Sequence, residues 1–308
     1  MFYITVSSKI ITMEKEMILL ILTGIIYGAA APAAQFLLNL GLSSYEIAVT
    51  TTIPTAILFL ILSASKKEII QRKDIKFFLF IGFLNSVLEL TWLGSISLGT
   101  PVSIFTLLLY TQPLWTIIFG SIFFKEKITR LKISSLIIVL VGVLILVSPW
   151  DIKSKLSLNG IILAGLSGFL YSLFLVVSKD ATNRKIHYTK YMFGFSIFTI
   201  FWLLTIQPFY QIMIKNDVLT RLDVNVISNK LFEIILGSII IKIVPVVLLY
   251  KGISKIKIST AGIVLLIEPV IATIIAYFIF NQPISQSVII GGFLIIFSNY
   301  LIIRKNES

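Results

Sequence analysis

The sequence predicts an all-α polytopic membrane protein with ten transmembrane helices, arranged as two inverted five-helix repeats. Three observations predict this fold class. The 308 residues are 57% hydrophobic and only 13% charged, whereas soluble domains carry about 25% charged residues. The hydrophobic residues form ten runs, most of them long enough to cross the hydrocarbon core of a bilayer. A pattern of residues also recurs 156 positions later in the chain.

Polar or helix-breaking segments separate the apolar runs and give the approximate helix boundaries. Three examples are 66–67 (Lys-Lys), 99–101 (Gly-Thr-Pro) and 281–283 (Asn-Gln-Pro). Each of them contains charged residues, turn-forming residues or proline, and such residues end a helix in an apolar chain. The expected helices cover 17–40, 46–64, 77–97, 101–123, 132–149, 158–178, 190–214, 231–250, 258–280 and 286–303.

The recurring pattern relates residues 103–128 to residues 259–284 without a gap. Both segments contain a polar residue followed by proline inside a long apolar run, Gln112-Pro113 in the first and Glu268-Pro269 in the second. A second echo relates Gly24-Ile-Ile-Tyr to Gly168-Phe-Leu-Tyr at a spacing of 144 positions. Five helices per repeat is an odd number, so the second repeat would enter the membrane from the opposite side. Such inverted repeats are typical of transporters whose site lies between the halves.

The repeats divide the chain into four parts. We expect an N-terminal cytoplasmic stub at 1–16, a first five-helix repeat at 17–149, a second at 158–303 and a cytoplasmic tail at 304–308. Met13 and Met17 are alternatives to Met1 as the start of translation. The two spacings differ by 12 positions, which we assign to a longer outer loop within 212–230. We expect this loop to be dispensable.

Successive loops are alternately rich and poor in lysine and arginine. With both termini inside, the inner segments carry 20 of the 26 lysine and arginine residues and the outer segments carry five. Cytoplasmic loops retain positive charge, so we expect a cell-membrane protein with both termini cytoplasmic. The same loops account for the net charge of +12, and no nucleic-acid partner is expected. The chain has no cysteine and one histidine, so no metal site is expected.

Three charged residues lie inside the expected helices: Glu89, Lys242 and Glu268. A charge in mid-bilayer costs several kcal/mol, so each one requires a reason. Polar residues at related positions are Asn85 and Ser86, on the Glu89 face, and Gln112, the repeat mate of Glu268. We interpret these residues as a cluster that binds the substrate or a proton coupled to it. The alternative is a buried ion pair that only joins helices.

Aromatic residues near these positions are candidates for the walls of the site. Tyr27, Trp92, Tyr110, Trp115 and Tyr171 could stack on a ring or cover an ammonium group. The alternative for each is packing between helices or an anchor at the membrane surface.

The residues resemble those of a known family. Tyr27-Gly28 is similar to the Trp-Gly pair of EamA-type transporters in the drug/metabolite transporter superfamily, and PLWTIIFGSIFFKEKIT and EPVIATIIAYFIFNQPIS resemble the two copies of its repeated helix and turn. The resemblance implies a ten-helix carrier for small organic solutes, with a central cavity lined by helices such as the third, fourth, eighth and ninth. Two positions depart from the family pattern: residues 50–54 (TTTIP) lack the arginine found in many members, and Gln282 stands where the first repeat has Glu126.

The sequence therefore predicts a secondary transporter, in the export direction, for small polar metabolites such as amino acids. It would work by alternating access, with proton coupling left open. The alternative is a carrier or flippase for lipophilic drugs or lipid-like substrates. An enzyme is not expected, because no clustered catalytic residues are visible, and no cofactor is expected. The expected partners are a small-molecule substrate and membrane lipid, with protons and a second copy of the chain as open alternatives.

Overall fold

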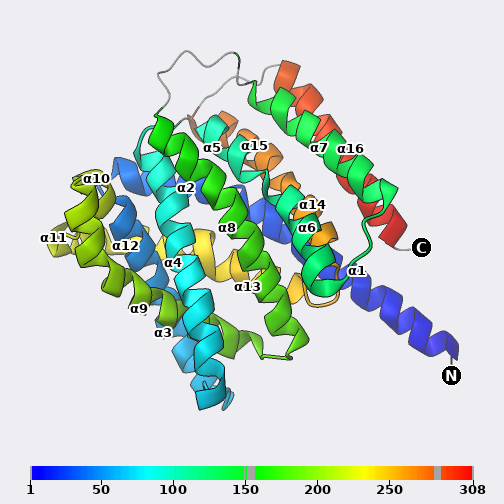
Figure 1. Ribbon diagram of the computed structural model, residues 1–308, viewed down its shortest axis with the longest axis horizontal. Helices are drawn as coiled ribbons and strands as arrows, with labels where there is room; N and C mark the ends of the chain where they lie inside the picture. The colour runs from blue at the N-terminus through cyan, green and yellow to red at the C-terminus, as the bar shows by residue number, and fades with distance from the viewer. Residues whose placement is uncertain (1, 101, 149, 151–156, 281–285, 307–308) are drawn as a thin grey trace.

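The computed structural model describes residues 2–100, 102–148, 150, 157–280 and 286–306, and within these residues it contains helices and no strand (Figure 1). The α-helices of the first half are α1 (Phe2–Tyr27), α2 (Ala30–Asn39), α3 (Ser44–Ser65), α4 (Ile75–Ser97), α5 (Val102–Leu109), α6 (Gln112–Phe124) and α7 (Arg130–Val147). Those of the second half are α8 (Leu158–Asn183), α9 (Tyr188–Ile214), α10 (Asp217–Thr220), α11 (Val224–Ser228), α12 (Leu231–Ser238), α13 (Val244–Gly252), α14 (Ile258–Val264), α15 (Glu268–Phe280) and α16 (Gln286–Asn306). Shorter turns are η1 (Arg72–Asp74), the π-helical η3 (Ile239–Ile243) and the 3-10 turn η4 (Leu265–Ile267).

Nine helical segments of the described chain are long and apolar enough to cross a membrane. They are Lys15–Asn39, Ser44–Ser65, Arg72–Ser97, Ile104–Phe124, Arg130–Val147, Leu158–Asn183, Tyr188–Ile214, Leu231–Gly252 and Gln286–Ile303. The segment expected as a further span, 258–280, is helical but is broken at η4, and its Ile258–Ala272 part is a shorter apolar helix. The count of ten transmembrane helices therefore stays a prediction. The all-helical membrane architecture is confirmed.

Helix starts agree with the capping residues in the sequence. The Ser43 hydroxyl accepts a hydrogen bond from the Glu46 backbone N–H, and the Glu46 carboxylate accepts one from the Ser43 N–H, which is a capping box. Ser157 caps α8, and the single histidine, His187, caps α9 through its ring. At the N-terminus α1 runs from Phe2 to Tyr27, and the expected division of the chain at residue 17 stays a prediction.

Two expected helices, 101–123 and 258–280, are each broken near the middle. α5 ends at Leu109 and α6 begins at Gln112, while α14 ends at Val264 and α15 begins at Glu268. Each second half-helix starts with the polar residue and proline that recur in the sequence. Proline has no N–H to donate, and its ring clashes with the carbonyl four residues earlier, so the helix cannot pass through it unchanged.

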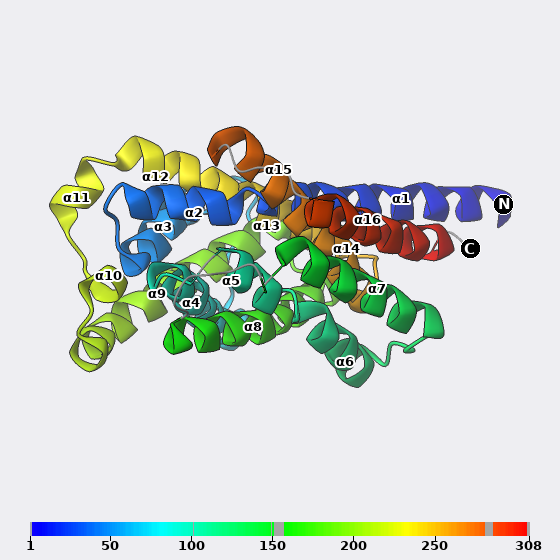
Figure 2. The same ribbon diagram turned by 90° about the horizontal axis from the view of Figure 1, so that it is seen from above.

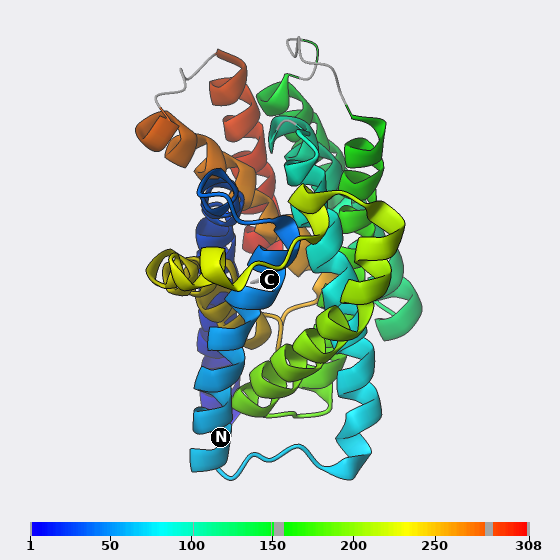
Figure 3. The same ribbon diagram turned by 90° about the vertical axis from the view of Figure 1, so that its left-hand side faces the viewer.

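The loops lie at two ends of the bundle. One end, called the basic end here, is defined by Lys66, Tyr188 and Lys251: the Lys66 ammonium donates to the Tyr188 hydroxyl at 3.2 Å, and the Lys251 ammonium lies 4.2 Å from the centre of the Tyr188 ring. The opposite end, called the α10 end here, holds the start of α3 beside α10, where Ser44 donates to the Leu219 carbonyl. In Figure 3, the loop after α3 lies at the same end of the molecule as the N-terminus.

Helices α7 and α16 pack side by side along one flank of the bundle (Figures 1 and 2). The Ser298 hydroxyl of α16 donates to the Ser135 carbonyl of α7 at 2.7 Å. Gly142 lets the backbones approach, because a Cβ atom there would lie 2.9 Å from the Gly291 carbonyl oxygen. Neither helix contributes a residue to the described lining of the cavity presented next.

Candidate functional site

A cavity lies between the helices of the bundle. Segments from both halves of the chain form it, and they include α4 from the first half and α8 and η3 from the second. Most of its wall is apolar or aromatic. The lining residues are Tyr27, Ala30, Ala31, Asn85, Leu88, Glu89, Trp92, Phe105, Leu109, Tyr171, Phe174, Phe195, Ile241, Lys242, Val246 and Glu268.

The π-helical turn η3 carries Lys242 into the cavity wall. Such turns insert one extra residue into a helix and are frequent at functional sites. The Lys242 side chain is 2% exposed. Its ammonium lies 3.3 Å from the Glu89 carboxylate, and it donates to the Thr52 hydroxyl and, at 3.2 Å, to the Ala48 carbonyl. The three N–H bonds of Lys242 thus have three acceptors from α3 and α4.

Glu89 connects this lysine to the aromatic wall. One carboxylate oxygen pairs with Lys242, and the other accepts a hydrogen bond of 2.9 Å from the Trp92 indole N–H. Asn85, one turn earlier on α4, donates to the Thr199 hydroxyl of α9 at 3.3 Å. The polar face of α4 is therefore tied to η3 and to α9.

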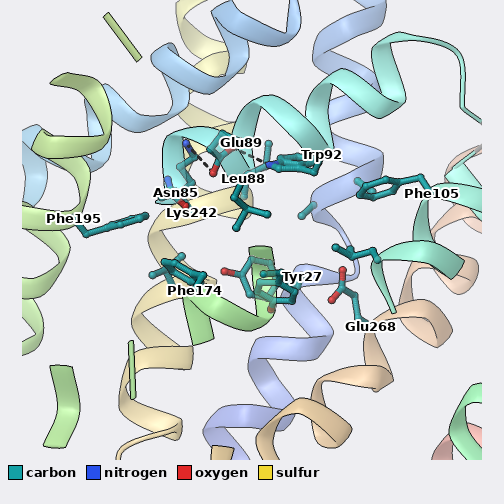
Figure 4. Close-up of a pocket in the computed structure, with 16 residues that line it drawn as sticks. Tyr27, Asn85, Leu88, Glu89, Trp92, Phe105, Phe174, Phe195, Lys242 and Glu268 are labelled. Carbon is teal, nitrogen blue, oxygen red and sulfur yellow. Dashed lines mark hydrogen bonds and ion pairs between the residues drawn. The ribbon is translucent and has the colours of Figure 1, made fainter. Parts of the chain in front are cut away.

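Glu268 lies across the cavity from this ion pair, with Tyr27 between the two sides (Figure 4). It is the first residue of α15 and is 9% exposed. In the described part of the chain its carboxylate has neither an ion-pair partner nor a hydrogen-bond donor. The phenol groups of Tyr27, Tyr110 and Tyr171 lie within electrostatic reach of it.

Glycines bring the broken helices close to the cavity. A Cβ atom at Gly28 would lie 2.9 Å from the Glu268 carbonyl oxygen, and one at Gly168 would lie 2.8 Å from the Leu108 carbonyl oxygen. Each glycine thus packs against the break in a helix of the other half of the chain. Tyr27 is next to Gly28 in the chain and Tyr171 is three residues after Gly168. Their rings meet edge to face, with centroids 6.2 Å apart.

Of the predicted site residues, seven line the cavity: Tyr27, Asn85, Glu89, Trp92, Tyr171, Lys242 and Glu268. The other four lie outside the lining. The Ser86 hydroxyl donates to the Phe83 carbonyl of its own helix, and the Gln112 side chain donates to Thr116. Tyr110 is buried behind the wall. Trp115 is 37% exposed and packs on Phe169, away from the cavity.

Several residues that hold Lys242 or line the cavity were not identified from the sequence. Thr52 and the Ala48 carbonyl hold Lys242, and the run of threonines at 50–52 was a signal for a polar stripe inside an apolar helix. Phe174 and Phe195 contribute to the wall, and their rings pack with centroids 5.6 Å apart. Among the described residues, no group of three or more His, Cys, Asp or Glu side chains is placed to hold a metal ion.

Comparison with known proteins identifies the family. The sequence pattern of the EamA-like transporter family matches residues 14–148 and 158–304. The chain belongs to this family. It is therefore an integral membrane transporter of the drug/metabolite transporter superfamily, with a small-molecule substrate and membrane lipid as partners. Family membership points to a transporter and not to an enzyme.

The similar proteins carry general names. An uncharacterized transporter of Clostridium kluyveri is 25% identical over 96% of this chain and 95% of its own length. An uncharacterized transporter of Archaeoglobus fulgidus is 29% identical over 64% of this chain and 66% of its own length. A solved structure titled only as the crystal structure of a protein superposes with a TM-score of 0.70 over 94% of this chain and 98% of that one. At 14% identity, that likeness shows the fold alone.

Proposed function

We propose that this EamA-family protein is a secondary carrier that exports small polar metabolites by alternating access. The observation that carries the proposal is the cavity, which lies between the halves and holds an ion pair and an isolated carboxylate. Polar and charged groups inside a membrane protein mark substrate or ion pathways.

Alternating access needs two similar-energy states, and an inverted repeat supplies them. Three observations support such a repeat of five helices per half. The family matches two segments, 14–148 and 158–304. The helix breaks lie at related positions, since residues 110–111 correspond to 266–267 at the spacing of 156. Gly24 and Gly168, which correspond at the spacing of 144, both approach the broken helix of the opposite half.

We further propose that the basic end faces the cytoplasm, with both termini on that side. The loops at this end include Lys66, Arg184 and Lys251, and cytoplasmic loops retain lysine and arginine. The plasma membrane is the proposed location. Glu89 and Glu268 are the proposed sites for a coupling proton, because a carboxyl group exchanges protons when its surroundings alternate between an ammonium and an apolar wall.

A carrier for lipophilic drugs or lipid-like molecules is the second candidate. The observation in its favour is the wall, in which Leu88, Phe105, Phe174 and Phe195 present apolar surface. Uptake and efflux by reconstituted vesicles separates the candidates. The panel should contain amino acids, amines, organic acids and lipophilic dyes, each measured with and without a pH gradient. Transport of none of these compounds by correctly folded protein would count against a carrier.

A further inference from the structure

The charged groups of the cavity differ in whether they are free to bind a substrate. Lys242 is the cationic residue of the described cavity lining, and its three N–H bonds already reach Glu89, Thr52 and the Ala48 carbonyl. An ammonium group has three donors and no more. The lysine therefore has no donor left for a substrate carboxylate or phosphate. The indole N–H of Trp92 is likewise bound to Glu89.

Glu268 is in the opposite situation. Its carboxylate lies on the far side of the cavity from Lys242 (Figure 4), and within the described residues nothing pairs with it. The hydroxyls of Tyr110 and Tyr171 are buried and have no hydrogen-bond partner among the described groups. Phenols and not cations therefore surround this carboxylate. The charged group of the cavity without a partner among the described residues is therefore a carboxylate, which accepts hydrogen bonds.

The charged groups give the cavity a net negative charge when Glu268 is ionised. Glu89 and Lys242 form an ion pair and cancel, so an ionised Glu268 leaves one negative charge in a mostly apolar space. An uncompensated charge in such surroundings is strongly unfavourable. A substrate that carries a positive charge removes this cost, whereas an anion adds to it.

The walls suit the remainder of such a substrate. Trp92, Phe105, Phe174 and Phe195 surround the space between the two carboxylates. Aromatic faces attract ammonium groups within about 6 Å and also accept apolar groups. The cavity thus offers an anionic acceptor at one side and an aromatic surface for a hydrocarbon body.

We propose that the substrate is an organic amine: a protonated amino group on an aromatic or aliphatic body, without a carboxylate. The ammonium pairs with Glu268, and the body packs on the aromatic wall. This inference rests on the proposed carrier function and narrows it. It differs from the amino-acid substrate that the sequence led us to expect, because a zwitterion brings a carboxylate for which the described cavity lining has no free cationic donor.

Four small molecules with one aromatic ring test the charge requirement directly. They are 2-phenylethylamine (cation), L-phenylalanine (zwitterion), phenylacetate (anion) and 2-phenylethanol (neutral). Binding to the purified, detergent-solubilised full chain is measured by isothermal titration calorimetry at neutral pH. We expect the amine to bind at least roughly tenfold more tightly than each of the other three.

Variants at Glu268 assign the charge requirement to this residue. Glu268→Gln keeps the shape and should weaken binding of the amine at least roughly tenfold, while binding of 2-phenylethanol changes little. Glu268→Asp should restore part of the affinity. Glu233→Gln, the same change at the start of α12 and outside the cavity lining, is the matched control and should leave binding unchanged. Size-exclusion profiles and melting temperatures verify that each variant is folded.

Several outcomes would overturn the inference. They are tighter binding of phenylalanine or phenylacetate, unchanged amine affinity in Glu268→Gln, or no binding of the amine by folded wild-type protein. The vesicle assay separates this failure from failure of the carrier function. Transport of a solute without an amine retains the carrier and removes the amine as its substrate. Specific amine binding without transport of any compound retains the amine as the ligand and removes the carrier function.

Discussion

The Glu46 carboxylate and the Arg221 guanidinium form an ion pair of 3.2 Å that joins the start of α3 to the loop after α9. Glu46 is fully buried and also accepts hydrogen bonds from the backbone N–H groups of Ser43 and Asp223, at 2.6 and 2.7 Å. The hydrogen bond with Glu46 raises the pKa of Arg221 above its ordinary value. The loop is thus anchored to the transmembrane bundle at the α10 end.

A second ion pair occupies the related position at the basic end. Lys190 lies 144 positions after Glu46, in the first turn of α9, and pairs with Asp74 in the loop after α3. In one pair an acid at the start of α3 binds a base in the loop after α9, and in the other a base at the start of α9 binds an acid in the loop after α3. Both are formed in this structure, so α3 and α9 are held together at both ends.

Arg221→Ala should destabilise the protein, because it leaves the buried Glu46 carboxylate without its cation. Arg221 is 39% exposed, so losing this pair costs a few kcal/mol, which corresponds to a fall in melting temperature of roughly 5 °C or more. Thermal unfolding of the purified protein measures it. Lys230→Ala, a half-buried cation in the same connection that forms no ion pair among the described residues, is the control and should change little. Equal effects of the two changes would contradict a structural role for the ion pair.

Shortening the connection between α9 and α12 should also reduce stability. The sequence alone led us to expect a dispensable loop at 212–230, but α10 and Arg221 contact the start of α3 through Ser43, Ser44 and Glu46. Deleting residues 217–228 removes these contacts. We expect a lower melting temperature and less protein in the membrane. A deletion variant with wild-type stability would restore the first expectation.

Gly168→Ala should disturb the contact between α8 and the break after α5. The new Cβ atom would lie 2.8 and 2.9 Å from the carbonyl oxygens of Leu108 and Leu109, and backbone atoms cannot turn away as a side chain does. Overpacking of this kind costs roughly 1–3 kcal/mol. The melting temperature of the purified variant measures this cost.

The same helix provides a control for this change. Nothing lies within 4 Å of a Cβ atom built at Gly165, one turn earlier on α8. Gly165→Ala should be neutral or slightly stabilising, because alanine favours a helix over glycine by about 1 kcal/mol. Similar effects at both glycines would show that the close approach at Gly168 does not determine the packing.

The sequence was sufficient for some features of the site and not for others. Glu89, Lys242 and Glu268 could be identified because a charge inside an apolar run requires a reason. The Lys242 contacts with Thr52 and Ala48 could not, because they depend on the π-helical turn at 239–243, which reads as an ordinary apolar segment. The sequence also did not show which side of a helix faces the lipid. Lipid-facing and buried positions are both apolar, so periodicity did not separate Trp92 in the cavity from the exposed Trp115.

The proposed orientation can be tested with single cysteines, because the chain has none of its own. Ile69→Cys lies in the loop after α3 at the basic end, and Val224→Cys lies in α11; the two positions are 68% and 72% exposed. In intact cells an impermeant thiol reagent should label the cysteine at 224 only. Labelling at 69 should require permeabilised membranes. The reverse pattern would place the basic end outside.

Lys242→Met should be more harmful than the double change Lys242→Met with Glu89→Gln. The single change leaves the Glu89 carboxylate buried, with only the Trp92 N–H as its remaining partner, and breaking a buried pair in this way costs roughly 3–5 kcal/mol. The double change removes both charges, and replacing a whole buried pair is often close to neutral. Melting temperatures of the wild type, both single variants and the double variant form a double-mutant cycle. We expect a coupling free energy of at least about 1 kcal/mol, and purely additive effects would mean that the two residues do not act as a pair.

Binding of 2-phenylethylamine by the folded double variant then separates the roles of the charged groups. Because the amine is expected to pair with Glu268, its affinity for the double variant should stay close to its affinity for the wild type.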